Sequence, residues 1–145
     1  MSVDPFSLHP LLVRDALPLV RLSLCQVLLA SDARYPWLIL VPERPGLRDF
    51  DEVAAGDVPL LHADIALACA VLRRLFQPDK LNVASLGNLV PQLHIHVIAR
   101  FQSDAAWPGP IWGRHSPLPY AAGVLEERVG VLREAFLHSS KYNLP

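Results

Sequence analysis

Apolar positions divide this chain into short runs, and the spacing inside each run predicts strands and helices. Four stretches are rich in Val, Ile and Leu and are bounded by turn residues or proline, as is typical of strands: residues 24–30, 35–42, 80–87 and 89–100. The first two are expected to pair as an antiparallel hairpin across the turn at 31–34. Asn88 lies near the bend between the last two.

Two other segments have helical spacing. After Asp57, a candidate N-cap followed by Pro59, apolar residues recur three or four positions apart until Pro78: Leu61, Ile65, Ala68, Cys69, Leu72, Leu75 and Phe76. A closing amphipathic helix is expected at about 119–138. The order β-β-α-β-β-loop-α predicts an α+β fold with an antiparallel sheet.

Composition narrows the class of protein. A chain of 145 residues with 52% hydrophobic and 19% charged residues suits one folded domain, and a net charge of −1 argues against binding to a nucleic-acid duplex. The apolar runs are shorter than the roughly 20 residues of a membrane-spanning helix. Cys25 and Cys69 are isolated, which indicates free thiols. Residues 1–12 resemble no export signal, so a cytoplasmic location is expected.

The most informative pattern is the alternation at residues 92–98. A strand has a side-chain period of two, so Gln92, His94 and His96 are expected on one face, with Leu93 and Ile95 on the other. Two histidines on one strand face indicate imidazole chemistry. The alternatives are a pair of solvent-facing histidines or a partial metal site, although zinc needs three or four ligands and no other cluster is visible.

These residues resemble the motif of the histidine triad (HIT) family, in which histidines alternate with hydrophobic residues along a strand. The context is similar as well: a strand at Leu38–Pro42, a basic residue at Arg44, a long helix, and a turn at Gly87–Asn88 before the motif. The resemblance covers about residues 24–107. It implies a single HIT-like domain over 1–145, with a core at about 20–107, about five antiparallel strands, a long helix and a C-terminal helix.

The resemblance also implies an activity. Family members hydrolyse or transfer nucleotides at the α-phosphate through a nucleotidyl-histidine intermediate, and the middle histidine of the motif is the nucleophile. By position this residue is His94, while His96 would contact phosphate oxygens or protonate the leaving group. The implied enzyme is a hydrolase that cleaves phosphorus anhydride or phosphoramidate bonds. It requires no cofactor, and the question of a metal stays open.

This chain departs from the family pattern at the first triad position, where Gln92 replaces histidine. A carboxamide can bind a phosphate oxygen, but it cannot carry a proton in acid–base catalysis. Gln92 is therefore expected to take part in catalysis by binding phosphate, or else to be an ordinary polar residue bonded to backbone. Its effect on activity is not decided by the sequence.

Further residues match nucleotide-contacting positions of the family. The Gly87 turn would present Asn88 to phosphate, and Arg100 follows the motif directly. Asp32 corresponds to an acidic residue that binds ribose hydroxyls, and Trp37 replaces a histidine that commonly precedes its strand. The expected nucleotide- or phosphate-binding set is Asn88, Gly87, Asp32, Trp37 and Arg100. The competing interpretations are core packing for Trp37 and a solvated charge for Arg100.

The segment Trp107-Pro108-Gly109-Pro110 resembles the Trp-Pro-Pro ending of dimeric family members. The resemblance predicts a homodimer that binds a nucleotide or dinucleotide. Whether residues 107–112 contact the partner's active site, which base is preferred and which group leaves are all open. Two alternatives remain: a non-catalytic nucleotide-binding protein with a degenerate triad, and a metal-binding strand protein that uses His94 and His96.

Overall fold

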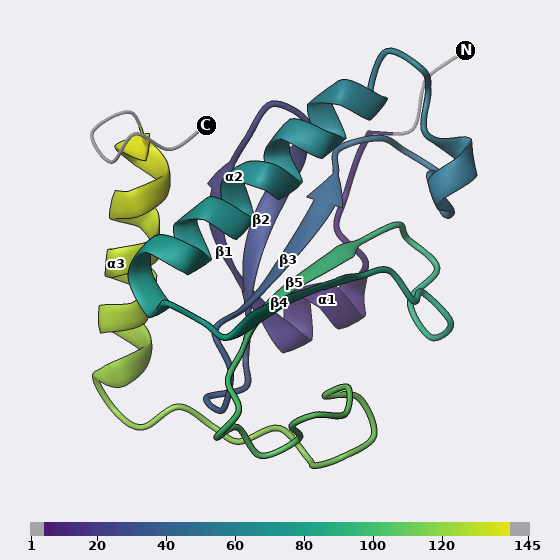
Figure 1. Cartoon of the computed structure of the whole chain (residues 1–145). Helices are drawn as coiled ribbons and strands as arrows, with labels where there is room; N and C mark the ends of the chain where they lie inside the picture. Colours follow the sequence, from purple (N-terminus) through teal and green to yellow (C-terminus); the bar gives the residue numbers. More distant parts are fainter. Residues whose placement is uncertain (1–4, 140–145) are drawn as a thin grey trace.

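The computed structural model describes residues 5–139. Its central element is a five-stranded antiparallel sheet (Figure 1). The strands are β1 (Ala16–Arg21), β2 (Cys25–Ala30), β3 (Trp37–Pro42), β4 (Lys80–Ala84) and β5 (Ile95–Arg100). Their spatial order is β1-β2-β3-β5-β4, and every neighbouring pair is antiparallel. The predicted α+β fold is confirmed, and so is the hairpin, in which Cys25 is opposite Pro42 and Leu29 is opposite Leu38.

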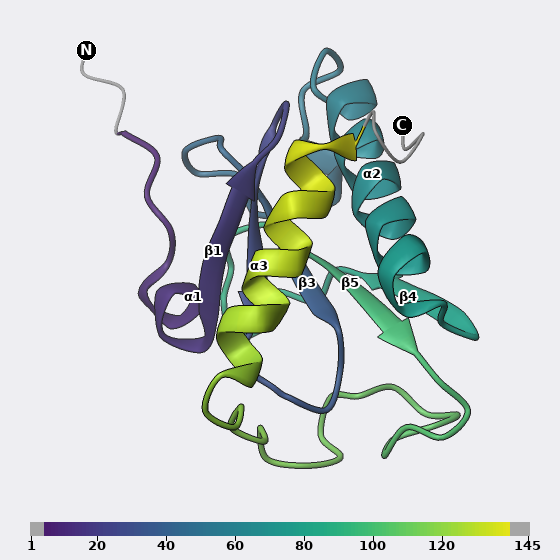
Figure 2. The same cartoon turned by 90° about the vertical axis from the view of Figure 1, so that its left-hand side faces the viewer.

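The two faces of the sheet are covered differently. Helices α2 (Val58–Phe76) and α3 (Val124–Leu137) lie on one face and the short helix α1 (Pro10–Asp15) lies on the other, with the sheet between α1 and α2 (Figure 2). Alternation decides which strand residues face the helices. Leu38 and Leu40 of β3 and Val97 of β5 belong to the core beneath α2 and α3, whereas Ile39 points to the opposite face.

Several element boundaries differ from the sequence prediction. Helix α1 and strand β1 were not predicted, because six residues each are too few to show a clear period. Strand β4 ends at Ala84 and β5 begins only at Ile95, so residues 85–94 form a loop rather than strand. Gly87 has a φ of +76° and Pro91 has no N–H to donate, and both features interrupt a ladder. The last helix begins at Val124, after Gly123 with a φ of +81°.

Helix α2 begins after Asp57, as predicted, and ends two residues before Pro78. The side chain of Asp57 does not cap the helix. It accepts two hydrogen bonds of 2.8 Å from the Arg44 guanidinium instead, which fastens the loop after β3 to the start of α2.

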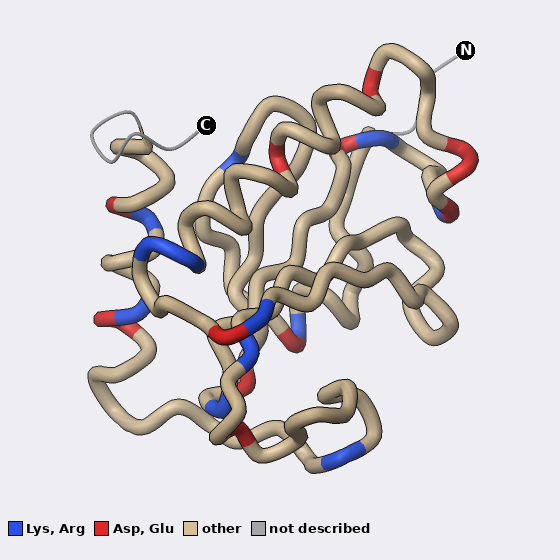
Figure 3. The backbone as a smooth tube through the Cα atoms, viewed as in Figure 1, with Lys and Arg blue, Asp and Glu red and all other residues tan. Residues whose placement is uncertain are grey.

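Basic and acidic positions are interspersed along the described chain (Figure 3). This distribution agrees with the near-neutral composition. Within residues 5–139, no helix is both long enough and apolar enough to cross a membrane.

One buried carboxylate stabilises the connection between β1 and β2. Asp64 of α2 is 3% exposed and accepts hydrogen bonds from the backbone N–H groups of Ser23, Leu24 and Cys25, at 2.8–3.2 Å. Its replacement by alanine leaves buried donors without acceptors. Asp64→Ala is therefore expected to lower the free energy of unfolding by about 3 kcal/mol in urea titrations. The exposed Glu126→Ala is the control, with an expected change below about 0.5 kcal/mol.

Candidate active site

Two histidines lie side by side at the start of β5, on the sheet face opposite α2 and α3. His94 directly precedes the strand and His96 is its second residue, and each is 6% exposed. Their ring centroids are 5.0 Å apart in an edge-to-face arrangement. The alternation predicted for His94 and His96 therefore places both imidazoles on one face.

The backbone fixes the tautomer of His94. Its Nδ1 lies 2.7 Å from the carbonyl oxygen of Gln92. A carbonyl can only accept a hydrogen bond, so Nδ1 carries the proton. In the neutral ring the lone pair is then on Nε2, which is the atom that a nucleophilic histidine needs free.

His96 has the opposite tautomer. The indole Nε1–H of Trp37 donates a 2.9 Å hydrogen bond to its Nδ1. Because an indole N–H can only donate, this Nδ1 holds a lone pair and the ring proton is on Nε2. Burial, reinforced by the proximity of His94, lowers the pKa of His96 to about 3. His96 is therefore a neutral hydrogen-bond donor at physiological pH.

The histidines open onto a cavity of about 470 Å³. Six residues of the predicted site line it: Asp32, Trp37, Gly87, Asn88, His94 and His96. Apolar side chains, among them Leu12, Ile39 and Val90, supply much of the remaining wall. An apolar cavity with a few convergent polar groups is typical of a small-molecule site.

Two loops bring polar groups to the cavity wall. The turn at Gly87 has a positive φ and presents the exposed Asn88. Asp32, which follows β2, accepts hydrogen bonds at Oδ1 from the N–H groups of Arg34 and Leu118, and the Arg34 guanidinium lies 3.5 Å from the same oxygen. The other carboxylate oxygen, Oδ2, makes none of these three contacts.

Leu93 belongs to the core beneath α2 and α3, and Gln92 binds the N-terminal segment that leads into α1, on the same side of the sheet as the two histidines. Gln92 is hydrogen-bonded to this segment. Its side-chain oxygen accepts from the N–H of His9 at 2.9 Å, and its amide group donates to the carbonyl of Ser7 at 2.8 Å. Gln92 is also absent from the cavity wall. The carboxamide thus fastens the N-terminal segment that leads into α1.

This geometry gives Gln92 a testable structural role. Gln92→Ala removes both hydrogen bonds, and we expect the free energy of unfolding to fall by about 1–2 kcal/mol. Backbone amides at residues 7–12 should exchange faster with deuterated water, because the segment loses its anchor. If Gln92 bound phosphate directly, substrate affinity would fall sharply while exchange at residues 7–12 stayed unchanged.

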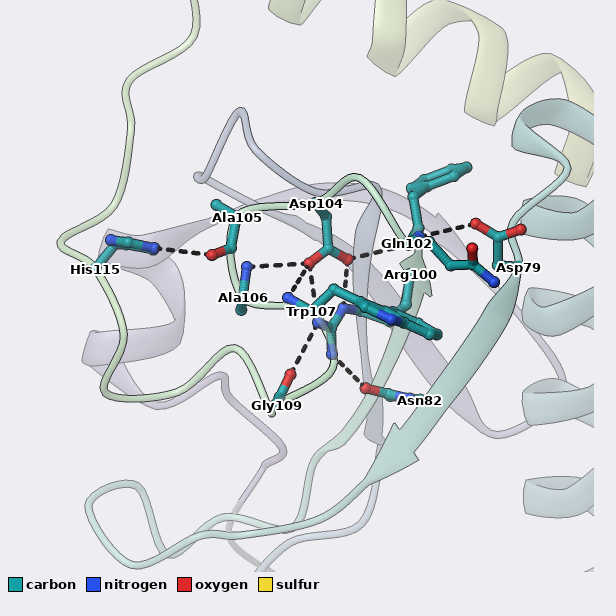
Figure 4. Close-up of polar contacts among 11 residues, drawn as sticks. Asp79, Asn82, Arg100, Gln102, Asp104, Ala105, Ala106, Trp107, Gly109 and His115 are labelled. Carbon is teal, nitrogen blue, oxygen red and sulfur yellow. Dashed lines mark hydrogen bonds and ion pairs between the residues drawn. The ribbon is translucent and has the colours of Figure 1, made fainter.

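Arg100 does not reach the cavity either, which contradicts the expected phosphate contact. The side chain is 1% exposed and lies beneath the loop that follows β5 (Figure 4). Its guanidinium donates to both carboxylate oxygens of Asp104 at 2.7 and 3.0 Å, to Asn82 Oδ1 at 2.7 Å and to the Gly109 carbonyl at 2.9 Å. Arg100 therefore organises the loop at 101–109.

Burial alone would raise the pKa of Asp104. The hydrogen bonds from Arg100 and from the backbone N–H groups of Phe101 and Ala106 outweigh it and lower the pKa to about 2. Asp104 thus stays ionised beside Arg100. The carboxylate also accepts from the N–H of Trp107, so one side chain fixes three backbone positions of this loop and pairs with Arg100 of β5.

The cavity includes residues that the sequence analysis did not assign to it. Helix α1 supplies Leu12, Arg14 and Asp15, and the C-terminal extension supplies Trp112 and Pro117. The ring of Trp112 packs against His96 with centroids 5.1 Å apart. The sequence offered one signal for them, the irregular Pro- and Trp-rich segment at 107–112, and such a segment does not reveal what it packs against. Within residues 5–139, no group of three or more His, Cys, Asp or Glu side chains is placed to hold a metal ion.

Comparison with known proteins agrees with this fold and site. The HIT domain family model matches residues 14–103. A histidine triad protein of known structure from Bradyrhizobium japonicum is 42% identical, with a TM-score of 0.87, and the match covers 90% of this chain and 97% of that one. A second, from Marinobacter aquaeolei VT8, is also 42% identical, with a TM-score of 0.81 and coverage of 97% and 99%. Among curated proteins no significant match was found.

The antiparallel α+β domain with its two facing histidines thus matches known histidine triad proteins in sequence and in fold. The chain belongs to the HIT domain family.

Proposed function

We propose that this protein hydrolyses a nucleoside-phosphate substrate, or transfers its nucleotidyl group, with His94 as the nucleophile at the α-phosphorus. The observation that carries the proposal is the hydrogen bond from His94 Nδ1 to the Gln92 carbonyl. It leaves the Nε2 lone pair available at a cavity large enough for a small ligand. Membership in the HIT family supports a nucleotide as that ligand.

In this proposal, different parts of the cavity bind different parts of the nucleotide. The apolar wall of Leu12, Ile39 and Val90 suits a nucleobase, and Asp32 Oδ2 is available to accept from ribose hydroxyls. The phosphate would lie at the two histidines, with Asn88 as a side-chain donor from the Gly87 turn. Gln92 and Arg100 have no contact with the substrate.

The reaction balances in two displacements. His94 Nε2 attacks the α-phosphorus, a P–Nε2 bond forms, and the bond to the leaving group breaks with its electron pair. Water then attacks phosphorus, the P–Nε2 bond breaks and returns its electron pair to His94, and one proton passes from the water to solvent. His96 Nε2–H donates a hydrogen bond to the phosphoryl oxygens in both steps.

We further propose a homodimer in the cytoplasm. Strand β4 is an edge of the sheet, and Val83 of that strand is 48% exposed, while Leu89 of the next loop is 80% exposed. Pairing of two copies along such an edge would cover unpaired backbone groups and apolar side chains. Free Cys25 and Cys69 fit a reducing compartment. Analytical ultracentrifugation of wild type and Val83→Lys tests the dimer, and the variant should shift towards monomer.

A substrate panel tests the activity. Purified protein is incubated with dinucleoside polyphosphates, nucleoside phosphoramidates and aminoacyl adenylates, and release of nucleoside monophosphate is followed by chromatography. Turnover of at least one class supports the proposal. Binding of nucleoside monophosphate without any turnover would favour the alternative of a non-catalytic nucleotide-binding protein. This alternative is worth testing because Gln92, at the first triad position, is hydrogen-bonded to the N-terminal segment.

A further inference from the structure

Three aromatic rings enclose the imidazole of His96. Trp37 lies 5.6 Å away between centroids, His94 5.0 Å and Trp112 5.1 Å. Trp37 also donates its indole N–H to His96 Nδ1 at 2.9 Å. Protonation of Nδ1 would break this hydrogen bond, because two N–H groups would then face each other. The fold therefore opposes the imidazolium form of His96.

The other groups at the cavity do not offer a proton in its place. Asp15 is bonded to Arg14, and that hydrogen bond lowers the pKa of Asp15. Asp32 Oδ1 faces donors only, because it accepts from two backbone N–H groups and lies 3.5 Å from the Arg34 guanidinium. Arginine does not release its proton in proteins.

The other polar groups considered as proton donors either hold another partner or have no proton to transfer. His94 must be neutral at Nε2 to attack, and its other nitrogen donates to the Gln92 carbonyl. Gln92 has no transferable proton and does not line the cavity. Further along β5, Arg100 is paired with Asp104 beneath the loop. Among the described residues that line the cavity, no carboxylate, imidazole or guanidinium is therefore placed as a general acid for a leaving group.

We infer that this site selects substrates whose leaving group departs as a stable anion, namely nucleotidyl anhydrides with a phosphate or carboxylate partner, and discriminates against nucleoside phosphoramidates. The inference rests on the proposed nucleotidyl-histidine reaction. Trp37 acts as a positioning residue, because its indole N–H binds His96 Nδ1 and so keeps the ring proton on Nε2.

The chemistry of the first displacement separates the two substrate classes. When an anhydride is attacked, the P–O bond breaks and the phosphate or carboxylate keeps the electron pair without needing a proton. When a phosphoramidate is attacked, the nitrogen must gain a proton before the P–N bond breaks, since an amide anion is too basic to leave. General acid catalysis contributes about 10²–10⁴-fold to such steps. A site without a general acid therefore loses this rate factor only when the leaving group is an amine.

The test compares two substrates with the same nucleoside, acetyl adenylate and adenosine 5′-phosphoramidate, together with their guanosine counterparts. We expect kcat/KM for the mixed anhydride to exceed that for the phosphoramidate by at least about 100-fold at pH 7. Equal or preferred turnover of the phosphoramidate would overturn this inference and leave the proposed function intact. Failure to turn over either class would overturn the proposed function itself.

Trp37→Phe tests the role of the indole, because it removes the donor and keeps an aromatic ring. We expect phosphoramidate turnover to rise towards pH 5 in this variant, relative to anhydride turnover, because protonation of His96 at Nδ1 no longer breaks the indole hydrogen bond. Trp112→Phe is the matched control, since Trp112 packs on His96 without donating to it. A pH profile of Trp37→Phe that matches both the control and wild type would contradict the positioning role.

A spectroscopic measurement on wild type covers the case in which Trp37→Phe does not fold. Nitrogen NMR of labelled protein should show His96 with Nε2 protonated and Nδ1 unprotonated from pH 8 down to about pH 5, well above its pKa of about 3. An imidazolium signal for His96 at pH 6 would overturn the inference.

Discussion

Replacement of His94 by alanine is expected to reduce kcat/KM by about 10⁴-fold or more. In the proposed reaction the change removes the atom that bonds to phosphorus, so neither His96 nor solvent can complete the same pathway. The folded structure should persist, because the hydrogen bond lost with the imidazole goes to a carbonyl near the protein surface rather than to the core. Initial rates with the best substrate of the panel provide the measurement.

The control is His62→Ala. His62 is an exposed residue of α2, on the sheet face away from the cavity, and its loss should leave kcat/KM within about twofold of wild type. Activity of His94→Ala close to that of the control would show that His94 is not the nucleophile.

The second large effect concerns stability. Asp104→Asn is expected to lower the free energy of unfolding by about 3–5 kcal/mol, because it leaves the buried Arg100 guanidinium without its counterion. Urea titration followed by far-UV circular dichroism measures the change. Since the loop carries Trp112 towards His96, the variant should also weaken the packing of that indole, which tryptophan fluorescence reports.

Asp79→Asn is the matched control. Asp79 is an exposed carboxylate that also accepts a backbone N–H from this loop, that of Gln102 at 2.8 Å (Figure 4). Its loss should cost about 1 kcal/mol. Equal effects of the two variants would mean that the buried pair with Arg100 is not the source of the stability.

The pair with Arg100 also sets a pH dependence. The pKa of Asp104 is lowered to about 2 in the folded protein, below the value of about 3.9 of an unperturbed aspartate. Its contribution to stability is therefore fully present above about pH 4 and is lost as the pH falls towards 2. The variant Asp104→Asn should lack this part of the acid dependence.

Sequence pattern predicted the sheet and the pair of histidines because both depend on local periodicity. His94 and His96 each follow from alternation next to the apolar Ile95 and Val97, which belong to the core under α2. The long helix was predictable for the same reason: its apolar residues recur over five turns and end before proline.

The sequence could not settle the role of a residue where a long-range contact decides it. Gln92 binds Ser7 and His9, which are more than 80 positions away in the sequence. Arg100 follows the motif directly, as a phosphate ligand might be expected to, but Asp104 and Asn82 capture its guanidinium. Neither pairing has a local signature.

Part of the cavity wall was missed for a related reason. This part comes from helix α1 and from the extension after residue 110, which reach the histidine face from the two ends of the described chain. Six helical residues give little periodicity, and an irregular segment gives none. At the first triad position, Gln92 is hydrogen-bonded to the segment that leads into α1 and does not line the cavity.

The stereochemical course at phosphorus tests the central claim most directly. A nucleotidyl anhydride with a chiral α-thiophosphate is hydrolysed in heavy-oxygen water, and the configuration of the product is determined. Attack by His94 followed by attack by water is a double displacement, so we predict net retention of configuration. Net inversion would show a single direct attack by water and would contradict the nucleotidyl-histidine mechanism.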